Sequence, residues 1–229
     1  MSRDKSELLQ ISGRFETEGE MEHIESHGNG HINDTFLLTC RRASGETCRY
    51  ILQRMNHEVF KDPEGLMENI AGVTAFLQKK IAENGGDPRR EALNVIPVKG
   101  GGSYWKEADG TFWRMYRFVE DAVSYDVVER PEDFYESALA FGHFQKLLAD
   151  YPADSLHETI PNFHNTVDRL NNFKKAAEAD PLGRASEVAE EIRFVLDREE
   201  DCHVLCDLLA SGEIPLRVTH NDTKLNNIM

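Results

Sequence analysis

The hydrophobic pattern of the chain changes near residue 120, and this change limits the folds that the chain can adopt. Before that point, short apolar runs alternate with Gly, Asn and Asp turns, which is typical of antiparallel strands. After it, apolar residues recur every three or four positions, which is typical of helices. The sequence therefore predicts an α+β fold in two lobes, an N-terminal lobe over residues 1–119 and a helical lobe over residues 120–229.

The N-terminal part combines extended segments with one long helix. Asp62-Pro63 is a helix start signal, with Asp as the N-cap and Pro at the first position, and Asn84-Gly85-Gly86 ends the helical period. Ala108-Asp109-Gly110 is an Asp-Gly turn, which predicts a hairpin. We expect a five-stranded antiparallel sheet with one helix. The segments with strand character are residues 21–26, 35–40, 48–55, 93–98, 103–106 and 111–118, and the helix covers residues 63–83.

The C-terminal part is expected to be helical until shortly before its end. Helical periods cover residues 131–150, 165–179 and 186–210, the last of them with an interruption. Residues 214–219 then form a brief extended run. This run leads into a polar loop that begins at His220.

The polar loop contains the spacing H-x-D-x-x-x-x-N, formed by His220, Asp222 and Asn227. In kinases this spacing places an aspartate to orient and deprotonate the attacking hydroxyl, and an asparagine on Mg²⁺. Lys224 lies two residues after Asp222 and can reach the transferred phosphate as a point charge. The alternative is a polar surface turn. The position of the loop, after a short apolar run that follows a β-rich and a helical part, favours the catalytic interpretation.

Two features of the N-terminal part could meet a nucleotide. Glycines at positions 28 and 30 lie in the first turn, where their N–H groups can approach phosphate oxygens, although an ordinary hairpin turn has the same pattern. Arg54 can form bidentate hydrogen bonds with phosphate oxygens and with a carboxylate. The expected carboxylate partner is Glu68, and Glu64 is the second choice. The chain has no G-x-x-x-x-G-K-[ST] motif, which disfavours a P-loop enzyme.

These segments together resemble the aminoglycoside phosphotransferase and choline kinase superfamily, and within it the N-acetylhexosamine 1-kinases. The resemblance is carried by residues 28–35 (GNGHINDT), 50–56 (YILQRMN), 66–70 (LMENI) and 221–227 (NDTKLNN). Asn221 and Thr223-Lys224 depart from aminoglycoside kinases, which more often have Gly and Leu or His there. The resemblance implies a protein-kinase-like fold with two lobes.

The resemblance also implies a set of site residues, with ATP and Mg²⁺ as cofactors. Asp222 would be the catalytic base and Asn227 a metal ligand. The implied reaction transfers phosphate from ATP to the anomeric 1-hydroxyl of N-acetylglucosamine or N-acetylgalactosamine, in carbohydrate salvage. The phosphates would lie under Gly28, Asn29, Gly30, His31 and Asn33, and adenine at a hinge formed by Arg117, Phe118, Val119 and Glu120.

Members of the superfamily continue past the catalytic loop. They have a further aspartate that holds Mg²⁺, and then helices that form most of the acceptor pocket. From the resemblance we expect this chain to be a fragment with an incomplete helical lobe and with weak or no activity. We also expect apolar helix surface that favours self-association.

Other functions remain open from the sequence. A kinase of the same fold could act on an aminoglycoside, choline, ethanolamine or a homoserine-type acceptor. A nucleotide-binding module without turnover, or an unrelated α+β interaction domain, belongs to another class. The net charge of −15 argues against a nucleic-acid partner, and no apolar run reaches the roughly 18 residues of a membrane span. The N-terminus has no signal-peptide pattern, so a cytoplasmic location is expected.

Overall fold

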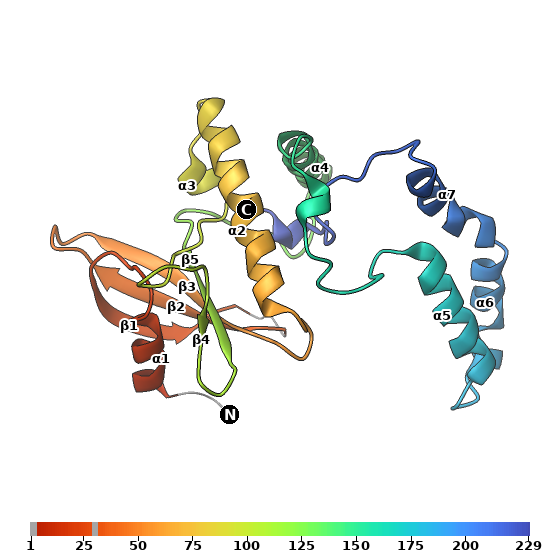
Figure 1. The fold of residues 1–229 in the computed structure, drawn as a ribbon, viewed down its shortest axis with the longest axis horizontal. Helices are drawn as coiled ribbons and strands as arrows, with labels where there is room; N and C mark the ends of the chain where they lie inside the picture. The colour runs from red at the N-terminus through yellow and green to blue at the C-terminus, as the bar shows by residue number, and fades with distance from the viewer. Residues whose placement is uncertain (1–3, 29–31) are drawn as a thin grey trace. The chain divides into compact units, whose positions relative to one another are not determined.

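The structure is a computed structural model that describes residues 4–28 and 32–229. Its contacts divide the chain into two compact units, Met1–Thr159 with Arg217–Met229, and Ile160–Leu216. Figure 1 shows the elements along the chain. The predicted boundary between residues 119 and 120 falls inside the first unit, because helices from both sides of that point pack together. The division into two lobes at this position stays a prediction.

A five-stranded antiparallel sheet forms the centre of the first unit, in the order β1-β2-β3-β5-β4. The sheet and its helices confirm the predicted α+β class. The elements of this unit are α1 (Lys5–Ser12), β1 (Glu20–Ser26), β2 (Asp34–Arg41), β3 (Thr47–Met55), α2 (Pro63–Glu83), α3 (Pro88–Glu91), β4 (Trp105–Lys106), β5 (Phe112–Arg117), α4 (Pro131–Leu147), η1 (Ala153–Ser155) and η3 (Leu225–Asn227).

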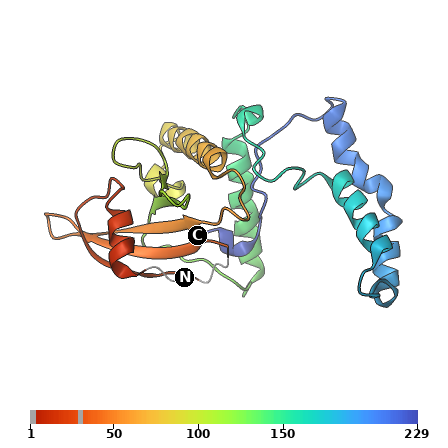
Figure 2. The same ribbon diagram turned by 60° about the horizontal axis from the view of Figure 1, so that its bottom comes forward.

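The two faces of the sheet are covered by different helices. One face buries Tyr50 and Leu52 of β3 in a cluster with residues of α1. The other face buries Met55 in a cluster with Met67 of α2. Figures 1 and 2 show α1 and α2 on opposite sides of the sheet. Because side chains alternate along a strand, even-numbered residues of β3 share the α1 face and odd-numbered ones share the α2 face.

Side chains cap the helices of this unit. The carboxylate of Asp62 accepts a hydrogen bond from the N–H of Gly65 at 2.9 Å, which starts α2 where the sequence predicts it. The carboxylate of Asp4 accepts one from the N–H of Glu7 at 2.8 Å and starts α1. Helix α1 was not predicted from the sequence, although an Asp followed three residues later by a Glu is a start signal.

Two predicted extended segments are not strands in the structure. Within residues 93–98, isolated bridges join Val95 to Tyr116 and Val98 to Phe15, and they do not extend into a strand. The N–H of Val98 bonds to the C=O of Gly102 at 2.9 Å, in a turn. Residues 214–219 belong to no strand either. Their position is set by burial of Val218 and not by backbone pairing.

Helix α4 links α2 to the segment before the loop at residues 220–227. Leu77 of α2, Leu148 at the end of α4 and Val218 share one buried cluster. The ammonium of Lys80 pairs with the carboxylate of Asp150 at 2.6 Å, just after α4. The loop that begins at His220 therefore starts on the side of the sheet that α2 covers, and Figure 2 shows η3 beside α4.

The second unit contains α5 (Thr166–Ala179), η2 (Ala185–Val188), α6 (Ala189–Leu196) and α7 (Glu199–Ala210). The predicted interruption within residues 186–210 is confirmed at residues 197–198. Lys174 of α5 pairs with Glu199 of α7 at 2.6 Å. In residues 4–28 and 32–229, no helix combines the length and the apolar character needed to span a bilayer.

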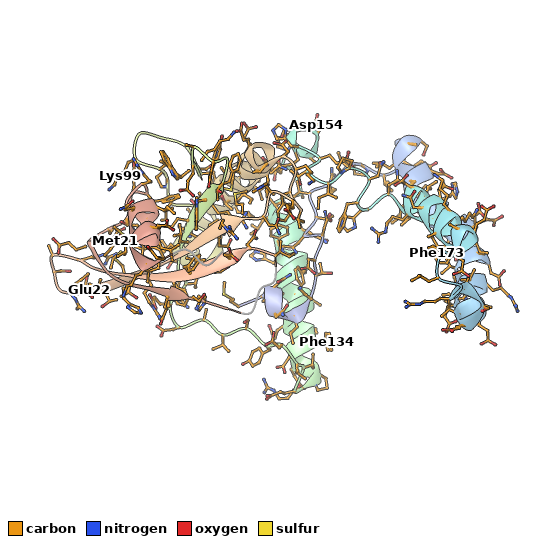
Figure 3. All side chains as sticks on the ribbon, turned by 90° about the horizontal axis from the view of Figure 1, so that it is seen from below. Met21, Glu22, Lys99, Phe134, Asp154 and Phe173 are labelled. Atoms are coloured by element: carbon orange, nitrogen blue, oxygen red, sulfur yellow. The ribbon has the colours of Figure 1, made fainter. Side chains whose placement is uncertain are left out.

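Large apolar side chains remain exposed on the helices of both units. Phe134 of α4 is 63% exposed and extends from the helix (Figure 3). In the second unit, Leu205 of α7 is 65% exposed. The predicted open apolar surface on these helices is thus present, and self-association through it stays a prediction.

Candidate active site

The loop from His220 to Asn227 is attached to α4 through aromatic contacts. The ring of His220 lies 5.4 Å from that of Phe141 and 5.8 Å from that of Phe144, measured between centroids. Val218, two residues earlier, is buried between α2 and α4. Two anchors on the same helix therefore fix the start of the loop, while Asp222 itself is exposed.

The loop brings together the three side chains that the sequence selected for catalysis. Asn227 Nδ2 donates to the carboxylate of Asp222 at 2.9 Å and to its backbone C=O at 2.8 Å. Lys224 Nζ lies 3.2 Å from the same carboxylate oxygen. The hydrogen bond from Asn227, followed by the bond from Lys224, lowers the pKa of Asp222 below its usual range. Asp222 is therefore held as a carboxylate, the form that can accept a proton.

The orientation of Asn227 decides which of its atoms could meet a metal ion. Its amide nitrogen is used by Asp222, so its Oδ1 is the free oxygen of the side chain. Mg²⁺ takes oxygen ligands and keeps several waters, so it needs few protein oxygens beside the phosphates of a nucleotide. Asn227 and the adjacent carboxylate fit this donor set. Among the described residues, no group of three or more His, Cys, Asp or Glu side chains lies where it could hold a metal ion.

A second asparagine ties the loop to the segment before α4. Asn226 Nδ2 donates to Asp126 Oδ1 at 3.0 Å. The adjacent residues Asn226 and Asn227 thus bond to two different carboxylates. Asn227 bonds to Asp222, the candidate base, and Asn226 bonds to Asp126. The sequence analysis did not single out Asn226 or Asp126.

The turn predicted to cover the phosphates lies partly outside the described residues. This applies to Asn29, Gly30 and His31. Gly28 has a φ of +75°, which favours glycine, and no atom lies within 4 Å of where a Cβ would stand. Asn33 Oδ1 accepts a hydrogen bond from the N–H of Asn56 at 3.0 Å, which joins this turn to the end of β3.

The predicted hinge leaves one peptide group available. The N–H of Arg117 donates to Asn94 and the N–H of Phe118 donates to Arg49, at 2.9 and 3.0 Å. Throughout residues 4–28 and 32–229, no hydrogen bond involves the N–H or C=O of Val119. Glu120, the next residue, forms an ion pair with Arg49. A held segment with one open peptide is what recognition of adenine by backbone groups requires.

The predicted pair between Arg54 and Glu68 is wrong. Arg54 Nη2 lies 2.5 Å from the carboxylate of Asp34, its direct cross-strand partner on β2. Glu68 lies 2.6 Å from Nε2 of His157. The reason is the alternation of β3, which puts Arg54 on the face that α1 covers and away from α2. Arg54 lines a pocket with Asp34 and Asn56 at the ends of β2 and β3, and a role there in nucleotide binding stays a prediction.

Two polar residues on the α2 face were missed in the sequence. Arg114 Nε donates to Gln53 Oε1 at 3.0 Å, and Gln53 Nε2 donates to Thr35 Oγ1 at 3.0 Å. Gln53 and Arg114 are direct cross-strand partners on β3 and β5. The usable signal was the alternation of β3, since the apolar pattern puts Tyr50 and Leu52 opposite to Gln53.

No family model matches the chain. A solved structure of an amicoumacin kinase, in complex with AMP-PNP, Ca²⁺ and Ami, matches with a TM-score of 0.46 and 12% sequence identity. The match covers 83% of this chain and 54% of that one, so this chain spans about half the length of its structural neighbour. The function proposed below therefore depends on contacts within this chain.

Proposed function

We propose that the chain is the nucleotide-binding and base-carrying part of a small-molecule kinase, which transfers the γ-phosphate of ATP to a hydroxyl. The observation that carries the proposal is the contact between Asp222 and Asn227. It supplies an ionised base and a free amide oxygen at the spacing that phosphoryl transfer uses. The open peptide at Val119 and the turn at Gly28 support the nucleotide side of the proposal.

In the proposed reaction each loop residue has one task. Asp222 orients the acceptor hydroxyl and takes its proton as the oxygen bonds to the γ-phosphorus. The bond from that phosphorus to the bridging oxygen breaks, and ADP leaves. Lys224 is within reach to neutralise phosphate charge. Mg²⁺, when bound with ATP, supplies neutralisation of the β- and γ-phosphates, and Oδ1 of Asn227 would hold it. Because little covalent chemistry falls to the protein, positioning and electrostatics are sufficient for catalysis.

For the acceptor we propose the anomeric hydroxyl of N-acetylglucosamine or N-acetylgalactosamine. The proposal is supported by the segments at residues 28–35, 50–56 and 221–227, which resemble sugar 1-kinases. The phosphate chemistry is the same for an aminoglycoside, an amino alcohol or homoserine, so the acceptor has to be determined by assay. A nucleotide-binding module without turnover is the alternative from another class.

The test measures ADP formation by the 229-residue chain with ATP and Mg²⁺. N-acetylglucosamine, N-acetylgalactosamine, an aminoglycoside, choline and homoserine are compared as acceptors. Because weak activity is expected of this chain, we expect slow acceptor-dependent ADP formation, which Asp222→Asn should reduce by at least about a further 10²-fold, the ordinary contribution of a general base. Asp150→Asn is the matched control, since Asp150 is also an exposed carboxylate paired with a lysine and should leave the rate unchanged. ATP binding with no transfer to any hydroxyl would contradict the proposal and favour the module without turnover.

A further inference from the structure

The sheet face that α2 covers carries a polar pair at its centre. Gln53 of β3 and Arg114 of β5 are direct neighbours, flanked on the same face by Ile51 and Tyr116. Both polar residues are half-buried. Met55 and its neighbours at one end of this face pack against α2, so the polar pair lies beyond the edge of that apolar contact. A half-buried guanidinium at such a position requires a specific reason, because desolvation of a charge is unfavourable.

Arg114 differs from the other arginines of the strands in its partners. Its Nε bonds to Gln53, and its guanidinium carbon lies 5.3 Å from the ring centre of Tyr116. Across residues 4–28 and 32–229, no carboxylate pairs with it and neither terminal nitrogen has a hydrogen-bond partner. Each of the other strand arginines pairs with a carboxylate: Arg41 with Glu22, Arg49 with Glu120, Arg54 with Asp34, and Arg117 with Glu18.

Arg114 also lies on the side of the sheet where the catalytic loop begins. Met67 of α2 packs on the face of Arg114, and Leu77 of the same helix packs against Val218. Arg54, by contrast, lies on the α1 face and is already paired. Arg49 and Lys106 also lie on this face, but each pairs with a carboxylate, so among the described residues of the strands Arg114 is the cation on this face that no carboxylate pairs with.

We propose that Arg114 binds the phosphate oxygens of the nucleotide, with Gln53 as the residue that positions it. The inference rests on the proposed function and assigns the basic residue that Arg54 was expected to be. The bond from Nε to Gln53 fixes the plane of the guanidinium and leaves Nη1 and Nη2 to donate. Two parallel N–H donors match the geometry of a phosphate group. The contact between Gln53 and Thr35 in turn fixes the amide of Gln53.

The experiment compares the affinities of ATP and adenosine for the full chain, by calorimetry with Mg²⁺. In Arg114→Gln we expect ATP to bind about 10–100-fold more weakly, because hydrogen bonds to a charged group are lost. Adenosine should bind within about twofold of the wild type. The matched control is Arg41→Gln, an arginine of β2 that pairs with Glu22 and has no assigned role, and it should change the ATP affinity by less than about threefold.

A second variant makes the test independent of the stability of Arg114→Gln. Gln53→Leu keeps the charge and removes the carbonyl that orients it, so we expect a loss of about threefold or more for ATP and none for adenosine. Melting temperatures of all variants verify that each is folded. Equal losses for ATP and adenosine in Arg114→Gln would show a packing role and overturn the inference, as would an unchanged ATP affinity in either variant of the polar pair.

The inference and the proposed function fail in different ways. If the wild type binds ATP but Arg54→Gln weakens it and Arg114→Gln does not, this inference alone is wrong. If the wild-type chain binds neither ATP nor adenosine, the proposed function is wrong and the inference falls with it.

Discussion

Helix α2 packs on the sheet and also contacts Val218, which precedes the loop at residues 220–227, and its attachment to the sheet can be tested at Met67. This side chain is completely buried, in a cluster with Met55 and Phe112. Met67→Ala removes the Cγ, Sδ and Cε atoms, which loses about 2 kcal/mol of transfer free energy. The cavity left behind raises the loss of unfolding free energy to about 3 kcal/mol. At roughly 2–4 °C per kcal/mol, the melting temperature should fall by about 10 °C.

Urea unfolding followed by tryptophan fluorescence measures this effect. Trp105 and Trp113 are the two tryptophans of the chain, and both lie in the first unit, so the signal does not include the second. Met67→Leu conserves volume and should lose less than about 1.5 kcal/mol. Lys79→Ala, at a side chain of α2 that is 75% exposed, should stay within about 0.5 kcal/mol of the wild type. A loss below about 1 kcal/mol for Met67→Ala would refute the described packing of α2.

Two further predictions concern pH. Asn227→Ala removes the hydrogen bond that most lowers the pKa of Asp222, so the acidic limb of the pH–rate profile of phosphoryl transfer should shift to higher pH. The same variant should reduce the rate roughly 10–100-fold. Asn226→Ala is the adjacent control, and a limb that moves equally in both variants would contradict the assignment. Burial raises the pKa of Tyr50 to about 12, so its contribution to stability should be complete below its ordinary pKa of 10.0 and decline as pH rises toward 12. Tyr50→Phe should remove this decline in urea unfolding, and it should also lose about 1–3 kcal/mol, since the buried hydroxyl accepts the N–H of Glu18. A decline that persists in Tyr50→Phe would show that another group causes it.

Elements with local signals were the ones that the sequence predicted correctly. The cap at Asp62 and the turn at residues 108–110 each determine a boundary through a few adjacent residues, and α2 and the β4–β5 hairpin follow. The segment 93–98 was wrong because a strand needs continued pairing with a neighbour. Val95 and Val98 form isolated bridges with two different partners, Tyr116 and Phe15, and nothing in the local apolar pattern indicates this.

The same difference between local and long-range contacts separates the residues of the candidate site that were predicted from those that were not. Asp222 and Asn227 lie five positions apart in one loop, so their spacing, together with the position of the loop after a helical part, was enough to select both residues. The partner of Arg54 was not predictable in this way. Alternation along β3 groups Arg54 with Tyr50 and Leu52, but it does not indicate which face receives α2. That information comes from long-range packing of Met55 against Met67, which puts Arg114, and not Arg54, on the face that α2 covers.

The central claim is that Asp222 acts as the base in transfer of phosphate from ATP to a hydroxyl, and a single-turnover measurement tests it most directly. The chain in excess over γ-labelled ATP is mixed with Mg²⁺ and the best acceptor, and labelled product is followed with time, beside ATP affinity measured separately. We expect Asp222→Asn to slow transfer by about 10²-fold or more while ATP affinity stays within about threefold, because the base contacts the acceptor and not the nucleotide. Transfer at the wild-type rate by Asp222→Asn, or loss of ATP binding with the transfer rate retained, would contradict the account.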